Sequence, residues 1–178
     1  MTPRTNLPVL LCVAQSVVTG GRFGRRLIKG GFGAIRRRDW TLLALAAAGG
    51  SAITPVQLQK TLFVLGRELP QEVGPNFYKF RPYNYGPFSP QIYEDAEALA
   101  QAGLVNAQQP TREHSWVTYA ATPRGLEAAQ ELNVELPVGT RRYIESLVKW
   151  ARSLTFQQLV SSIYRKYPEQ RANSIFVE

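Results

Sequence analysis

The chain has 178 residues, of which 44% are hydrophobic and 11% aromatic. A chain of this size and composition buries roughly 70% of its unfolded surface, which excludes an intrinsically disordered protein. The net charge is +8, but all of it comes from residues 1–38, which hold eight basic residues and no acid. Residues 39–178 hold 13 residues of each sign. The basic balance therefore indicates a polyanion partner for the N-terminal extension alone.

The cysteine count and the hydropathy pattern limit the setting in which the chain works. Cys12 is the only cysteine, so an intrachain disulfide is excluded, and a cytoplasmic protein is the expectation. No run of about 18 apolar residues is present, so we expect no membrane-spanning helix and no membrane partner.

The extension, residues 1–38, has two interpretations. Residues 20–38 are rich in glycine and arginine and contain no carboxylate, a composition that is unfavourable for a helix or a core. One interpretation is a flexible cationic arm that contacts phosphates or anionic lipid, with Arg36, Arg37 and Arg38 as candidate nucleic-acid contacts. The other is an upstream stretch with little role. In both, the folded domain begins near Asp39.

The first two predicted helices follow the extension. Asp39 is the expected N-cap of a helix that carries Trp40 and ends at glycines 49 and 50. A second helix runs from Pro55 to the residue before Pro70. Its start has the pattern of a capping box, with Thr54 as the cap and glutamine three residues later.

An aromatic segment, residues 76–88, separates these helices from the third. Residues 76–80 are predicted to be extended and residues 85–87 to form a turn. A third helix then covers residues 89–103. Two strands are predicted at residues 104–107 and 116–120, joined by a polar tip, and a further helix starts at Thr122.

The C-terminal part adds two helices, over residues 140–153 and from Thr155 to the residue before Pro168, the second with a capping box. Three helices, a hairpin and a helix in this order are typical of the winged helix, a variant of helix-turn-helix. The predicted fold class is mainly α with a small β-hairpin (α+β). The expected domains are a winged helix at residues 39–136 and, packed on it, a C-terminal helical annex at residues 137–178.

Three stretches of the sequence carry a resemblance to known families. They are LQKTLFVL at residues 58–65, YKFRPYNYGPFSPQIYEDAEALAQAGLV at 78–105 and IYRKYPEQRANS at 163–174. The chain from about residue 39 to 175 resembles the uncharacterised bacterial YwgA-type winged-helix proteins and, more distantly, the Panacea (SocA-like) antitoxin domain. The latter resemblance implies a toxin-neutralising or adaptor function through protein contact. The long hairpin and the C-terminal helices depart from the Panacea pattern.

The residue inventory indicates a protein that is not an enzyme. His114 is the only histidine and falls in the hairpin tip, where no partner holds it for catalysis. One cysteine and one histidine exclude a Cys/His zinc cluster. Glu94, Asp95 and Glu97 spread over the outer half of a helix, which is typical of a solvated face. We therefore expect no catalytic residue, no metal and no cofactor.

In a winged helix the third helix normally enters the DNA major groove. Here its outward face carries Glu94, Glu97 and Gln101, flanked by Gln91 and Asp95, and the helix has no lysine or arginine. Carboxylates near phosphates are unfavourable. A DNA-binding transcriptional regulator, dimeric through residues 140–167, is thus the second hypothesis. Its candidate nucleic-acid contacts besides the arginines of the extension are Lys60, Arg112 and His114.

The aromatic segment is the alternative site. Six aromatic side chains within 12 residues either line a partner-binding surface or clamp the loop onto the helices. The first hypothesis is a regulatory module that binds another protein, such as a toxin. Its candidate partner-binding residues are Arg81, Tyr83, Tyr85, Gln91, Glu94 and Glu97.

Overall fold

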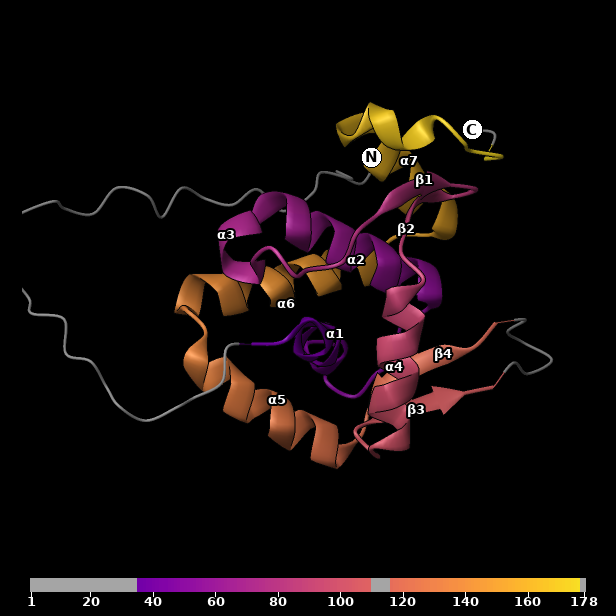
Figure 1. Ribbon diagram of the computed structural model, residues 1–178. Coiled ribbons are helices and arrows are strands. Elements are labelled where there is room, and N and C mark those ends of the chain that lie inside the picture. Colours follow the sequence, from indigo (N-terminus) through magenta and orange to yellow (C-terminus); the bar gives the residue numbers. More distant parts are fainter. Residues whose placement is uncertain (1–34, 110–115, 177–178) are drawn as a thin grey trace, which may run out of the picture.

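In a computed structural model of the chain, which describes residues 35–109 and 116–176, helix α1 (Arg37–Ala46) lies at the centre and other helices surround it (Figure 1). Every residue of α1 from Asp39 to Leu45 is buried. A helix that is apolar on nearly all sides must be covered on all sides. Four of the other helices and one strand provide that cover. The described residues are mainly helical with two small antiparallel sheets, which confirms the α+β class.

The first helix begins earlier than the sequence indicated. Its N-cap is Arg36, and Asp39 stands three residues further on, in the first turn. The Asp39 carboxylate accepts hydrogen bonds from the Arg36 backbone N–H at 2.9 Å and from the Arg36 side chain at 3.2 Å. Asp39 is therefore not the N-cap. Residues 36–38 belong to the folded part and not to the extension.

Helix α2 (Pro55–Glu68) has the predicted start. The Thr54 hydroxyl accepts from the Gln57 backbone N–H at 3.3 Å, and the Gln57 side chain accepts from the Thr54 N–H at 3.0 Å. This reciprocal pair confirms the capping box. One further turn of helix, α3 (Pro70–Val73), follows and was not predicted. Proline suits the first position of a helix, so Pro70 ends α2 and begins α3.

The aromatic segment forms a second hairpin at a place where the sequence indicated only a turn. Strand β1 (Arg81–Tyr83) pairs with β2 (Gly86–Phe88), and Tyr83 lies opposite Gly86. The predicted turn at residues 85–87 is therefore misplaced by one residue, and residues 76–80, predicted to be extended, precede β1 without pairing in a strand. The turn lies at residues 84–85, and Gly86 has a φ of +93°, a conformation that favours glycine.

Helix α4 (Gln91–Gln101) buries Ile92, Ala96 and Leu99, as predicted, and also Asp95. The predicted hairpin follows as β3 (Val105–Gln108) and β4 (Thr118–Ala121). Its tip, with Arg112 and His114, lies outside the described residues. Ile53, in the link between α1 and α2, pairs with Tyr119 of β4 and adds a third strand position to this sheet.

The remaining elements are α5 (Pro123–Glu135), α6 (Val138–Ser153), α7 (Phe156–Lys166) and the short 3-10 helix η1 (Pro168–Arg171). Thr122 and Thr155 cap α5 and α7 as predicted. The apolar face of α6 packs against α1 and α2. Among the described residues no helix is long and apolar enough to cross a membrane.

Candidate binding surface around the β1–β2 hairpin

The β1–β2 hairpin is fixed to α2 by three hydrogen bonds. The Gln59 side chain donates to the Ser89 carbonyl at 2.8 Å and accepts from the Ser89 N–H at 3.0 Å. The Lys60 ammonium donates to the Pro87 carbonyl at 3.1 Å. Two of the segments that carry the family resemblance, residues 58–65 and 78–105, thus contact each other directly at this hairpin.

The C-terminal segment holds the hairpin from another side, and Figure 1 shows it beside β1 and β2. The Ile175 N–H donates to the Asn84 carbonyl at 3.0 Å, and the Asn173 side chain donates to the Pro82 carbonyl at 3.2 Å. The Tyr164 hydroxyl donates to Ser174 at 2.7 Å, which positions this segment on α7. The hairpin is therefore anchored at both strands and at its turn.

Next to the hairpin lies an apolar groove of about 580 Å³. Three large aromatic side chains stand around it and remain half exposed: Tyr85 at 40%, Trp116 at 50% and Phe156 at 43%. They come from the hairpin turn, the start of the β4 segment and the first turn of α7. The Tyr85 and Phe156 rings meet edge to face, with centroids 5.1 Å apart. We name this feature the aromatic groove. The remaining lining residues are Thr54, Pro55, Val56, Gln57, Leu154 and Leu159.

A smaller pocket of about 170 Å³ adjoins the groove and has Lys60 in its wall. Lys60 is only 4% exposed, and this burial lowers the pKa of its ammonium group to about 7. Lys60, a predicted nucleic-acid contact, therefore lies beneath β2, and this pocket adjoins it. We name this feature the Lys60 pocket.

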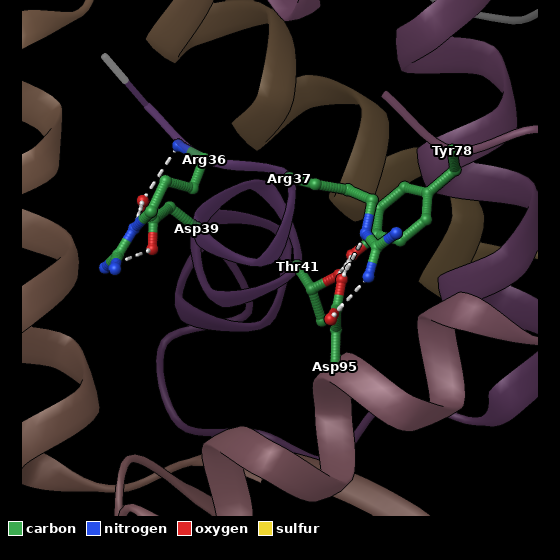
Figure 2. A network of polar contacts seen from close by, with 6 residues as sticks. All are labelled: Arg36, Arg37, Asp39, Thr41, Tyr78 and Asp95. Atoms are coloured by element: carbon green, nitrogen blue, oxygen red, sulfur yellow. Dashed lines mark hydrogen bonds and ion pairs between the residues drawn. The ribbon is translucent and has the colours of Figure 1, made fainter. Parts of the chain in front are cut away.

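A polar network joins α1, α4 and the segment before β1 (Figure 2). The Arg37 guanidinium donates two hydrogen bonds to Asp95, at 2.9 and 3.0 Å. The Tyr78 hydroxyl donates to Asp95 at 2.7 Å and lies 2.6 Å from the Thr41 hydroxyl. Burial raises the pKa of Tyr78, so the phenol stays protonated and keeps donating.

This network corrects one expectation from the sequence and gives Arg37 a partner within the chain. Asp95 is 8% exposed and faces inward, so it is not part of the solvated acidic face. Arg37 is occupied by Asp95 and also lies over the Tyr78 ring, 5.4 Å from its centroid. Its hydrogen bonds to Asp95 raise the pKa of Arg37 more than burial lowers it. Arg37 therefore has a structural role in this network.

The structure brings together only part of the predicted partner-binding set. Arg81 lies over the Tyr83 ring at 5.7 Å, and both are exposed on the hairpin with Tyr85. Glu94 and Glu97 are exposed on α4, but neither they nor Gln91 line the groove or the pocket. Of the predicted nucleic-acid contacts in the extension, Arg36 is exposed and pairs with Asp39, and Arg38 is half buried.

Sequence reasoning missed the aromatic groove itself. Phe156 occupies the first position of a helix whose capping box was recognised, and it lies off the buried stripe of Leu159 and Ile163. An apolar side chain in that position was the available signal. Trp116 was assigned only to a strand. Nothing local in the sequence indicated that it lies in the wall of the same groove as Tyr85 and Phe156.

Comparisons with known proteins add no further assignment. No protein-family model matches the chain, and no curated protein matches it. Over residues 35–109 and 116–176, no group of histidine, cysteine and carboxylate side chains is arranged to hold a metal ion. The inference of function therefore depends on the geometry of the groove and the pocket.

Proposed function

We propose that the protein is a non-enzymatic regulatory module that binds another protein through the aromatic groove. The observation that carries this proposal is the convergence of Tyr85, Trp116 and Phe156, from three elements, around one apolar groove. Aromatic side chains beside a hollow are typical anchors of protein interfaces. An antitoxin or adaptor, the type of function that the family resemblance implies, works through contacts of this kind.

The surroundings of the groove support a protein ligand. The hairpin that carries Tyr85 is anchored on two sides by hydrogen bonds, so little ordering is needed when a partner binds. Arg81 and Tyr83 extend the exposed surface beyond the groove, and arginine and tyrosine are enriched at interfaces. A partner segment would place apolar side chains in the groove and polar groups against this edge.

We further propose that α1, α2, α4 and the β3–β4 hairpin form a variant of the winged helix. The order of these elements and the pairing of Ile53 with Tyr119 support this. In such a module α4 corresponds to the helix that reads DNA. Its sequence, QIYEDAEALAQ, contains no lysine or arginine, and Glu94 and Glu97 are exposed on it. This charge favours a protein partner over DNA.

A DNA-binding regulator is the second candidate, supported by the basic surface of α6. Arg142, Lys149 and Arg152 are exposed on one side of that helix, with one exposed acid, Glu145, between them. If they contact phosphates, changing all three to glutamine in the full chain reduces the slope of log affinity against log salt by about 3 on random duplex DNA. An unchanged slope contradicts phosphate binding by α6.

The protein-binding proposal is tested with a photo-crosslinking residue placed at position 85 and, as control, at position 134. Val134 is 77% exposed on α5 and does not line the groove. We expect a defined partner to be crosslinked from position 85 only. The purified partner should then bind the double variant Tyr85→Ser, Phe156→Ser at least about 30-fold more weakly than the wild type. The control variant Val134→Ser should bind like the wild type, and equal binding by all three proteins contradicts the proposal.

A further inference from the structure

Lys60 has hydrogen-bonding capacity that the described residues do not use. An ammonium group has three N–H donors, and one of them bonds to the Pro87 carbonyl. Over residues 35–109 and 116–176, the ion pairs within 4.0 Å involve other cations, and none includes Lys60. A cation that is only 4% exposed and has no carboxylate partner is costly in a folded protein.

The space next to Lys60 has room for the missing anion. The Lys60 pocket measures about 170 Å³, more than ten times the roughly 10–15 Å³ that one water molecule requires. The ammonium lies close to Gly86, since a Cβ at that position would be 3.7 Å from the Lys60 Nζ. The other polar side chains of the wall are neutral: Gln59, Asn84, Tyr83, Tyr85 and Tyr93.

We propose that the Lys60 pocket binds a carboxylate, supplied by an aspartate or glutamate side chain of the partner protein. The pocket and the aromatic groove share Val56 and Tyr85 in their walls, so one segment of the partner can fill both. An apolar side chain of that segment enters the groove, and its acidic neighbour reaches Lys60. The inference rests on the proposed function, to which it adds the charge of the residue that the site selects.

The phenols of Tyr83, Tyr85, Tyr93 and Tyr164 are the titratable groups around Lys60 on the hairpin, α4 and α7. Between pH 6 and pH 8 the group that changes charge there is therefore Lys60 itself. A carboxylate binds to the protonated ammonium. Its apparent affinity should fall about tenfold between pH 6 and pH 8, in proportion to the protonated fraction of Lys60.

The pocket is tested on the full chain with acetate as the probe and acetamide as its neutral control, by following the NMR signal of the Lys60 Cε. We expect a saturable shift with acetate, a weaker effect at pH 8 than at pH 6, and no response to acetamide. Lys60→Met keeps the shape of the side chain and removes a buried charge, so it should fold and show no acetate binding by ligand-observed NMR. Equal responses to acetate and acetamide, no saturation, acetate binding that persists in Lys60→Met, or tighter binding of inorganic phosphate overturns the inference.

The crosslinked partner separates this inference from the proposed function. Loss of partner binding in both Lys60→Met and the double variant Tyr85→Ser, Phe156→Ser supports both. Loss in the groove variant with unchanged binding by Lys60→Met overturns the carboxylate inference and leaves the proposed function in place. Unchanged binding by the groove variant overturns the proposed function, whatever Lys60→Met does.

Discussion

Arg37 and Lys60 are both cationic side chains drawn into the protein, but their surroundings differ. Arg37 forms a two-point ion pair with Asp95, and the same carboxylate accepts from Tyr78 (Figure 2). Lys60 is more deeply buried, bonds to one backbone carbonyl and has a pocket beside it. The first arrangement is complete within the chain, whereas the second leaves donors unused.

The difference shows that burial of a charge does not by itself assign a role. The Asp95 network connects three segments, α1, α4 and the residues before β1, and each of its groups has a partner in the chain. Such a satisfied network stabilises one arrangement of the core. Lys60 also positions the hairpin through Pro87, but its remaining donors fit a ligand better than a purely structural role.

The largest expected effect is that burial of Lys60 lowers the free energy of unfolding by an amount that depends on pH. Burial lowers its pKa to about 7, so between pH 7 and about pH 10 the unfolded chain binds a proton that the folded chain does not. Stability must therefore rise with pH across this window, and the cost of burial is full below it. Relative to Lys60→Met, the wild type should gain about 4 kcal/mol between pH 6.5 and pH 10, measured by urea unfolding.

The comparison uses only the difference in free energy of unfolding between the wild type and Lys60→Met. All other titrating groups are present in both proteins, so their contributions cancel. Below pH 7 we expect Lys60→Met to be the more stable protein. A difference that stays constant from pH 6.5 to pH 10 would show that Lys60 keeps its ordinary pKa and is solvated or paired after all.

The next effect is the loss of the carboxylate from the complete network. Asp95→Ala leaves the Arg37 guanidinium and the Tyr78 hydroxyl without their acceptor. The free energy of unfolding should fall by about 3 kcal/mol, less than for a fully buried pair because Arg37 keeps about a third of its exposure. Glu94→Ala, on the exposed face of the same helix, should change it by no more than about 0.5 kcal/mol. Similar losses in the two variants would show that Asp95 is not specially paired.

A smaller loss is expected from the phenol of the network. Tyr78→Phe removes the hydrogen bonds to Asp95 and Thr41, at 2.7 and 2.6 Å, and keeps the ring. The cost should be about 1–2 kcal/mol in the free energy of unfolding. Tyr83→Phe, at a side chain that is 45% exposed, is the matched control and should leave stability unchanged. If Tyr78→Phe left the free energy of unfolding unchanged, the hydrogen bonds from Arg37 alone would satisfy the Asp95 carboxylate.

The sequence predicted those parts of the fold that depend on local patterns. The capping boxes at Thr54 and Thr155 were recognised because both members lie three residues apart, and they start α2 and α7. The same local rule misplaced Asp39, since an acid before an apolar run is also typical of an N-cap. Arg36 extends the helix and places Asp39 inside the first turn.

The parts that were missed depend on contacts between distant residues. Spacing along α4 places Asp95 at the edge of the exposed face, and its partner Arg37 is 58 residues away. Lys60 lies on a side of α2 that the β1–β2 hairpin, distant in sequence, covers. The groove takes its aromatic side chains from positions 85, 116 and 156. No window of sequence contains such a site.

The smallest expected effect on the free energy of unfolding comes from an ion pair that is exposed to solvent. The Arg67 Nη2 and Glu169 Oε1 atoms are 2.6 Å apart, and the two side chains are 51% and 49% exposed. Because solvent and salt screen such a pair, Glu169→Gln should lower the free energy of unfolding by no more than about 0.5 kcal/mol, and this difference should vanish in 1 M salt. The loss in Asp95→Ala should persist in the same salt, because the Asp95 side chain is only 11% exposed. If 1 M salt removed both differences, Asp95 would be as well solvated as Glu169, and the contrast between a closed network at Arg37 and an open site at Lys60 would no longer hold.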